Sequence, residues 1–297
     1  MQLVVLAAGH GRRFGGLKQL APVGPNGEAI MDYTARAAEA CGYSGVVLVV
    51  REEIREEILA HVRRRWPATL SVAIVCQPAR PGTAQAVLSA RPAVEGPFGV
   101  ANADDLYGEA ALGTLLEHFS APTSQLSARD PLAASRHLLV AYRLVRTVLT
   151  AGPVTRGLCE VGEDEQLLRI VEHTVRLRDD GRFEAAPLAR PGATAAEVRE
   201  LSGDERVSMN LWGFHPRMFD HLASALERFE PERAPRPELL LPDVVGALVE
   251  SRADSVHVVD TEARCIGVTH REDVAIVREE LAVHAGDHAP LRAARGR

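Results

Sequence analysis

Residues 3–20 read LVVLAAGHGRRFGGLKQL, and this stretch decides the fold. Its first part, Leu3 to Gly9, is a continuous apolar run that ends in glycine, as is typical of a strand buried on both faces of a parallel sheet. A glycine-rich loop with two arginines follows and leads to Lys18. Because glycine has no Cβ and tolerates positive φ, such a loop can bring backbone N–H groups against phosphate oxygens.

Spacing excludes two well-known phosphate loops. The dinucleotide-binding pattern GxGxxG requires a third glycine at the position of Phe14. The Walker pattern GxxxxGK[ST], counted from Gly11, reaches Gly16 and then meets Leu17 where it needs lysine. The loop therefore predicts neither a Rossmann dehydrogenase nor a P-loop ATPase.

Strands and helices are expected to alternate after the loop. The apolar and amphipathic patterns predict helices over 29–41, 52–66 and 83–90 and strands over 45–50, 70–77 and 97–104. Such alternation is typical of a mostly parallel sheet, which binds ligands at the carboxyl ends of its strands.

The pattern loosens after about residue 120 and indicates a second lobe. We expect strands over 138–144, 167–177, 206–214 and 255–260 and helices over 216–229 and 241–251. Residues 182–202 are rich in Ala, Pro and Glu and are predicted to be a mobile excursion. We expect one domain over 1–280, with lobes of about 1–120 and 121–280, and a C-terminal tail over 281–297.

Composition narrows the class of protein. A formal net charge of -6 over 297 residues argues against a nucleic-acid binder, which usually gathers basic residues on one face. The four cysteines show no CxxC pair and no zinc spacing, so we expect reduced thiols. Without a signal-type or membrane-spanning run, we expect a cytoplasmic protein that binds no membrane, and the oligomeric state, a homo-oligomer included, stays open.

Residues 6–20, LAAGHGRRFGGLKQL, resemble the signature LxAGxGxRfxxxxxKxL of the nucleotidyltransferases that make nucleotide sugars. The resemblance covers about residues 1–280. It implies the α/β fold of nucleotide-diphospho-sugar transferases, Rossmann-like with a mostly parallel sheet and a smaller sugar-binding lobe. It also implies that an NTP and a sugar 1-phosphate are the substrates and that pyrophosphate is released.

Within the loop, the resemblance implies that Arg13 and Lys18 are catalytic and supply positive charge to the phosphates. It implies nucleotide contacts for five residues of the strand end and the loop: Leu6, Ala7, Ala8, Gly9 and Gly11.

The base site is implied by similarity to N-acetylglucosamine-1-phosphate uridylyltransferases, of which only the uridylyltransferase domain, without the hexapeptide-repeat domain, is matched. There, a glutamine at a strand end and a Gly-Thr pair opening the next helix hold the base, and Gln77, Gly82 and Thr83 match them. Taken alone, Thr83 fits a helix N-cap, and its combination with Gln77 favours ligand contact. A glutamine amide donates and accepts hydrogen bonds together, which suits a pyrimidine NTP.

A metal site is implied where the strand FGVANADD ends. In the family a carboxylate at this position binds Mg²⁺, which prefers oxygen ligands. Asp104 aligns best, and Asp105 is the second candidate, with helix capping or loop stabilisation as its alternative roles. The family's other metal ligand is an Asp or Asn in a late strand, where Thr269 stands here, so Asp273, Asp105 or water takes its place.

The second lobe carries three residues that the resemblance places around the sugar: Gly157, Glu172 and Asn210. Carboxylates and amides bind sugar hydroxyls well because each offers paired hydrogen-bonding atoms. The attacking phosphate oxygen is already an anion, so the predicted reaction needs no general base.

Two other functions stay open at this stage. One is a cytidylyltransferase for a sugar-alcohol or isoprenoid-precursor phosphate, which shares an early glycine loop and a Lys-Gln pair like Lys18-Gln19 but usually has a shorter chain. The other is a non-catalytic relative that senses nucleotide sugars. Such relatives usually lose the arginine and lysine of the loop, and both are present here.

Overall fold

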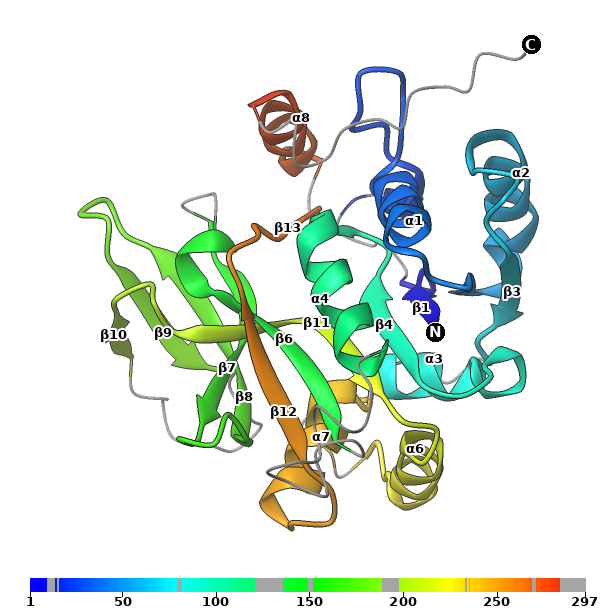
Figure 1. The fold of residues 1–297 in the computed structure, drawn as a ribbon. Coiled ribbons are helices and arrows are strands. Elements are labelled where there is room, and N and C mark those ends of the chain that lie inside the picture. The colour runs from blue at the N-terminus through cyan, green and yellow to red at the C-terminus, as the bar shows by residue number, and fades with distance from the viewer. Residues whose placement is uncertain are drawn as a thin grey trace.

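The computed structural model describes residues 1–9, 14, 16–78, 82–120, 136–148, 152–188, 198–232, 234, 236–268 and 271–283. In this part of the chain, 11 strands form one mixed sheet, with a two-stranded sheet beside it (Figure 1). The long sheet runs in the order β10-β9-β8-β7-β11-β4-β1-β2-β3, and β6 and β12 branch from β11.

Four parallel strands form the half of the sheet near the N-terminus. They are β1 (Gln2–Leu6), β2 (Gly45–Val50), β3 (Val72–Cys76) and β4 (Phe98–Asn102), in the order β3-β2-β1-β4. Every residue of β2 is buried, because helices cover both faces of a parallel sheet. The predicted parallel arrangement is confirmed here, and the carboxyl ends of these strands share one edge.

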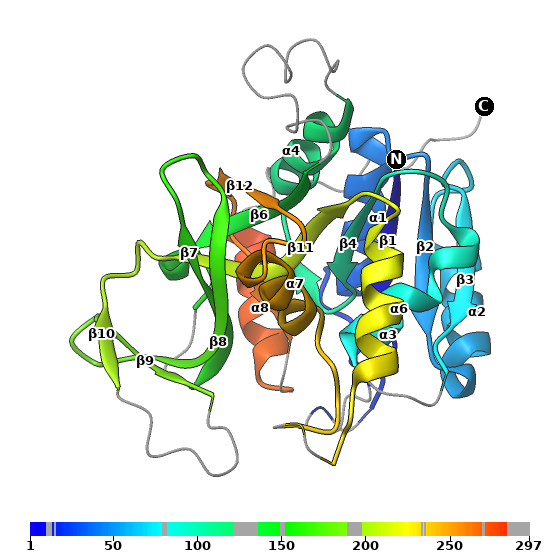
Figure 2. The same ribbon diagram turned by 90° about the horizontal axis from the view of Figure 1, so that it is seen from below.

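Helices pack on both faces of this half (Figure 2). One face is covered by α1 (Ile30–Cys41), α2 (Arg55–Arg65) and α4 (Glu109–Ser120). The other face is covered by α3 (Thr83–Ser89), α6 (Met218–Arg228) and α7 (Leu241–Glu250). Short 3-10 turns complete the connections: η1 (Lys18–Leu20), η2 (Glu52–Ile54), η3 (Arg91–Ala93) and η5 (Leu144–Arg146).

Strand β11 (Arg206–Phe214) joins the two halves of the sheet. Val207 lies between β6 (His137–Arg143) and β7 (Val154–Val161), whereas Trp212 lies between β6 and β4. Strands β7 and β4 therefore follow each other along the same side of β11. The register with β6 shifts between Ser208 and Trp212, so β11 bulges where one neighbour replaces the other.

The second half of the sheet is antiparallel. From β7 it continues through β8 (Leu167–Leu177), β9 (Phe183–Pro187) and β10 (Arg199–Leu201). The prediction that 182–202 is a mobile excursion was wrong for these two last strands, because Phe183 and Leu201 are buried and pair with each other. Residues 189–197 lie outside the described part.

The last described segment returns to the N-terminal half. Strand β13 (Ile266–Gly267) pairs with β5 (Asp105–Leu106), and α8 (Asp273–Val283) follows it. Val277 and Leu281 of α8 pack in a small core with residues of the 22–33 segment, β5 and β13. Among the described residues, we find no helix with the length and apolar character to span a membrane.

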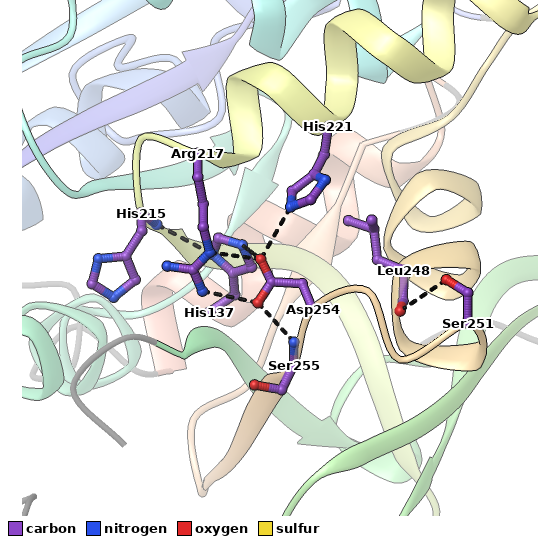
Figure 3. Close-up of polar contacts among 8 residues, drawn as sticks. All are labelled: His137, His215, Arg217, His221, Leu248, Ser251, Asp254 and Ser255. Carbon is purple, nitrogen blue, oxygen red and sulfur yellow. Dashed lines mark hydrogen bonds and ion pairs between the residues drawn. The ribbon is translucent and has the colours of Figure 1, made fainter. Parts of the chain in front are cut away.

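A partly buried polar cluster around Asp254 ties together β6, α6 and the start of β12 (Val256–Thr261) (Figure 3). Arg217 donates two hydrogen bonds to the Asp254 carboxylate, at 2.6 and 2.8 Å, and the Ser255 N–H donates a third at 2.8 Å. The rings of His137 and His221 each place Nε2 3.1 Å from Asp254 Oδ2. The carboxylate is thus held by groups from three elements.

Candidate functional site

The end of β1 and the first residues of the loop are held by their neighbours in the sheet. The Ala7 N–H donates to the Val49 carbonyl at 2.8 Å, and Arg51 Nε donates to the Ala8 carbonyl at 3.1 Å. Leu6 and Ala7 are buried, and Gly9 is exposed at the edge of the sheet. The backbone of Ala7 and Ala8, two of the predicted nucleotide contacts, is therefore held by hydrogen bonds to β2 and to Arg51.

Gln19 closes the described part of the loop. Its buried side chain donates hydrogen bonds of 2.9 Å to the carbonyls of Ala7 and Gly9. This brings the neighbouring Lys18 against the end of β4, where Lys18 Nζ forms an ion pair with Asp104 Oδ2. Both side chains stay partly accessible, 19% and 22% exposed, so the pair lies at the surface that a ligand would meet.

The predicted base site lies at the end of β3 and the start of α3. Gln77 Nε2 donates to the Gly82 carbonyl at 3.1 Å, which links the strand end to the helix start. Gly82 has φ +115°, and a Cβ there would lie 2.4 Å from the Leu239 carbonyl oxygen, so only glycine fits. The Thr83 hydroxyl accepts a 2.7 Å hydrogen bond from the Leu241 N–H at the start of α7.

Thr83 therefore lies in the first turn of α3 and its hydroxyl caps another helix. The N-cap of α3 is Gly82, so the N-cap alternative for Thr83 was wrong. The contact with Leu241 places α7 beside the predicted base site.

Asp105 is buried, 8% exposed, directly behind Asp104. Burial and the charge of Asp104 raise the pKa of Asp105 to about 6. A 2.8 Å hydrogen bond from Asn102 Nδ2 acts in the opposite direction and lowers it. The backbone of Asp105 pairs with Gly267 of β13. A Cβ on residue 267 would lie 2.3 Å from Asp105 Oδ1, so a glycine there leaves room for the carboxylate. Asp105 does not cap α4, which begins at Glu109.

A cavity of about 180 Å³ opens where β4 gives way to β7 along β11. It is lined by Asn102, Asp104, Asp105, Thr155, Arg156, Gly157, Glu172, Ser208, Met209, Asn210 and Pro242. Both aspartates and all three predicted sugar-binding residues are in this set. They come from the end of β4 and from β5, β7, β8 and β11, and the bulge of β11 lies where these strands meet.

Asn210 forms the centre of the bulge. Its φ of +60° is in the left-handed region, which asparagine tolerates better than most residues. Its Oδ1 accepts a 3.1 Å hydrogen bond from Trp212 Nε1, which orients the side chain.

Glu172 faces Gly157 across the β7–β8 pair at the wall of the cavity. Its carboxylate accepts a 2.6 Å hydrogen bond from Arg236 Nη1, in an ion pair. Arg236 also lies 3.5 Å from Asp243 Oδ1 in α7. The predicted sugar carboxylate is therefore already oriented by a cation from the α6–α7 connection.

Some predicted residues lie outside the described part of the chain. These are Gly11 and Arg13 in the loop, and Thr269 in the late strand. The chain just before Thr269 runs beside Asp104, because the Val268 N–H donates to the Asp104 carbonyl at 3.0 Å. Within the described residues, no three His, Cys, Asp or Glu side chains gather in a metal-binding group.

The sequence did not point to four residues of this region. Arg156 and Ser208 line the cavity, Arg236 orients Glu172, and Gly267 makes room for Asp105. Their roles depend on contacts with distant segments, and none of them belongs to a local motif. For Arg156 the one available signal was its position next to the predicted Gly157.

Comparisons with known proteins give the family and the fold of the chain. A family model, the MobA-like NTP transferase domain, matches residues 3–215. Comparison with curated protein sequences gives no significant match. A solved inositol-1-phosphate CTP transferase from T. maritima is similar in structure, with a TM-score of 0.62, 16% identity, and coverage of 95% of this chain and 96% of that chain.

A second solved structure, assigned as a glucose-1-phosphate thymidylyltransferase from Bacillus anthracis in complex with a sucrose, has a TM-score of 0.62 and 11% identity. It covers 94% of this chain and 95% of its own. At these identities the two likenesses establish a shared fold.

The fold, the loop at the end of β1 and the matched family model define a nucleotidyltransferase, as predicted. The chain belongs to the MobA-like NTP transferase family.

Proposed function

We propose that this enzyme couples an NTP, of the pyrimidine type, to a sugar 1-phosphate and releases pyrophosphate. A phosphate oxygen of the acceptor forms a bond to the α-phosphorus. The bond from the α-phosphorus to the oxygen bridging to the β-phosphate breaks, and its electron pair leaves with pyrophosphate.

The observation that carries this proposal is the cavity between β4 and β7. It places the Asp104–Asp105 pair, at the end of a nucleotide-side strand, next to Gly157, Glu172 and Asn210 of the other half. A carboxylate pair beside a set of hydroxyl-binding groups is what a reaction between a nucleotide phosphate and a sugar phosphate requires. The cavity opens beside Lys18, which pairs with Asp104.

The residues present fit a divalent cation. Asp104 and Asp105 supply oxygen donors, which suit Mg²⁺. Burial and, after it, the nearby charge of Asp104 raise the pKa of Asp105, and a bound cation would oppose this rise. Bound Mg²⁺ would neutralise phosphate charge and polarise the α-phosphate. We propose Asp104 as its main ligand and Asp105 as the second.

The chain's own residues do the positioning. Lys18 exchanges its contact with Asp104 for phosphate oxygens, and the backbone of Ala7, Ala8 and Gly9 lines the phosphates and base. Gln77 offers its amide to the base while Gly82 permits close approach. Because the nucleophile is an anion, catalysis rests on orientation and charge neutralisation.

The experiment that tests the proposal is a substrate matrix. Each of the common NTPs is incubated with a panel of sugar 1-phosphates, and pyrophosphate release is measured with Mg²⁺ and with a chelator. We expect release for a pyrimidine NTP with a sugar 1-phosphate, and none with the chelator. If pyrophosphate is released only with a purine NTP, the pyrimidine assignment is wrong. If none of the sugar 1-phosphates supports release, the acceptor assignment is wrong.

A second acceptor class is favoured by a specific observation. The structure of the inositol-1-phosphate CTP transferase is covered over 96% of its length, so a polyol-phosphate cytidylyltransferase need not have a shorter chain. Chain length therefore does not count against this alternative. CTP with polyol phosphates belongs in the same matrix, and turnover confined to those pairs selects this alternative.

A further inference from the structure

Arg156 lies in β7 next to Gly157 and lines the candidate cavity together with the two aspartates. Neighbouring residues of a strand face opposite sides of the sheet. The Cβ position of Gly157 faces Ile170, 3.2 Å away, so the Arg156 side chain leaves β7 on the other side. There it reaches Thr147, which follows η5.

Three hydrogen bonds hold the guanidinium in one orientation. Nε donates to Thr147 Oγ1 at 3.0 Å, Nη1 donates to the Thr155 carbonyl at 2.7 Å, and Nη2 donates to the Thr147 carbonyl. A guanidinium has five N–H groups, so two of them have no hydrogen-bond acceptor among the described residues. Both lie on the terminal nitrogens, which suits an anion with two oxygens.

All acceptors of Arg156 are neutral. In the described ranges, no carboxylate lies within 4.0 Å of its guanidinium, and Asp105 acts on it only over a longer distance. Burial lowers the pKa of Arg156, which shows that its charge is poorly solvated. Buried charges are usually paired, and the partly buried Arg156 guanidinium has no carboxylate in ion-pair contact among the described residues.

The other cations near the cavity differ in this respect. Lys18 is paired with Asp104, and Arg236 is paired with Glu172. An incoming anion therefore gains most from Arg156, which loses no protein ion pair when it binds.

We propose that Arg156 binds the phosphate of the acceptor, and this inference rests on the function proposed above. Asp104 and Asp105 mark the side of the cavity that belongs to the nucleotide half, and Glu172 and Asn210 mark the hydroxyl-binding side. Arg156 precedes Gly157 in β7 and lines the same cavity, where the phosphate of a bound sugar phosphate would meet the nucleotide. The two remaining N–H groups bind two phosphate oxygens and leave a third free to attack.

Kinetics with the best substrate pair test this role. Arg156→Ala should raise the KM for the acceptor by about 10- to 100-fold, since a charged hydrogen bond contributes roughly 1.5–3 kcal/mol. The KM for the NTP should stay within about twofold. Arg156→Lys keeps the charge but loses the paired donors, so its acceptor KM should lie between those of wild type and Arg156→Ala. Arg176→Ala, at an exposed position of β8, is the matched control and should behave as wild type.

A binding measurement tests Arg156 without turnover. In the ¹⁵N spectrum of arginine side chains, the Arg156 Nε signal is identified by its absence in Arg156→Lys. Titration with inorganic phosphate should shift this signal, and the Arg176 signal should stay unchanged. Thermal unfolding of each variant shows whether the loss of the Thr147 contacts has affected the fold.

The two proposals fail in different ways. If wild-type protein releases no pyrophosphate with any acceptor phosphate, the proposed function is wrong, and the phosphate titration still decides the role of Arg156. If wild type turns over and Arg156→Ala keeps its acceptor KM, or if phosphate leaves the Arg156 signal unmoved, the inference about Arg156 is overturned.

Discussion

At the residue scale, the ion pair between Lys18 Nζ and Asp104 Oδ2 joins the glycine-rich loop to the end of β4. We expect Lys18→Ala and Asp104→Ala each to lower kcat by at least about 100-fold, because both remove charge stabilisation at the reacting phosphates. Both side chains are partly exposed, so the unfolding temperature should change little. Steady-state pyrophosphate release and circular dichroism measure the two effects. Near-normal kcat in both variants would contradict the assignment.

Substitution of Gly267 is expected to affect the position of the Asp105 carboxylate. A Cβ at this position would lie 2.3 Å from Asp105 Oδ1, so Gly267→Ala must displace the carboxylate. We expect weaker Mg²⁺ activation, seen as a several-fold higher Mg²⁺ concentration at half-maximal rate, and a loss of about 1–3 kcal/mol of stability.

The control for this change is Gly113→Ala in α4. There the nearest atom is Cys41 Sγ at 3.7 Å, an ordinary contact, and alanine favours the helix by about 0.5–1 kcal/mol. Gly113→Ala should therefore be neutral or stabilising, with unchanged Mg²⁺ dependence. Equal behaviour of the two variants would show that Gly267 does not make room for Asp105.

At the element scale, helix α8 packs against the glycine-rich loop. Arg271 Nε donates to the Phe14 carbonyl at 2.8 Å, and its guanidinium lies 5.6 Å from the Phe14 ring centre. Arg278 donates to the Pro22 carbonyl at 2.7 Å. Because Arg271 holds Phe14 by a hydrogen bond and a ring contact, Arg271→Ala should raise the KM for the NTP by about 3- to 10-fold.

The acceptor KM should be unaffected by Arg271→Ala, which separates this change from that of Arg156. Arg264→Ala, which loses an ion pair to Glu280 on the same helix, serves as its control. If both variants raise the NTP KM equally, α8 acts through its general packing and Arg271 has no special part.

The Asp254 cluster predicts how stability depends on pH. Burial, with the charges of Arg217 and His137, lowers the pKa of His215 from 6.5 to about 4. The unfolded chain therefore binds more protons between those values, and stability falls as the pH drops from about 6.5 to 4. Although burial opposes its ionisation, hydrogen bonds from Arg217 and His137 lower the pKa of Asp254, which adds a loss at still lower pH.

Urea unfolding at pH 7 and pH 4.5 measures this dependence. His215→Gln should remove about 1 kcal/mol of the difference, because the partly exposed ring is partly screened by water. A pH dependence identical to that of wild type would exclude His215 as a contributor.

At the scale of the whole molecule, β11 pairs with strands of both halves of the sheet. We therefore expect the halves to unfold together. Trp66 packs in the N-terminal half and Trp212 in β11, and both are buried. In Trp66→Phe and in Trp212→Phe, the fluorescence of the remaining tryptophan and the circular dichroism signal should show the same midpoint. Two separate transitions would mean that the halves are independent.

Local pattern was sufficient for much of the fold. The strands over 45–50, 167–177 and 206–214 have the predicted bounds, because apolar periodicity and chain-local preferences specify them. Strands β9 and β10 were missed, since their sequence is not apolar enough to show a period. Pairing with β8 stabilises β9, and pairing with β9 stabilises β10. Helix α8 was missed for a similar reason: its contacts are with the 22–33 segment and β13.

The buried strand and the glycine-rich loop that follows it depend on local chemistry, and so the class of enzyme was readable from the sequence alone. Asp104, Asp105, Gly157, Glu172 and Asn210 were predicted from the family resemblance, and all five line one cavity. Their meeting in one cavity was decided only by the tertiary structure, through the bulge in β11 and the exchange of β7 for β4 beside it. Strand pairing between segments distant in the chain sets which side chains face one another, and no local pattern specifies that pairing.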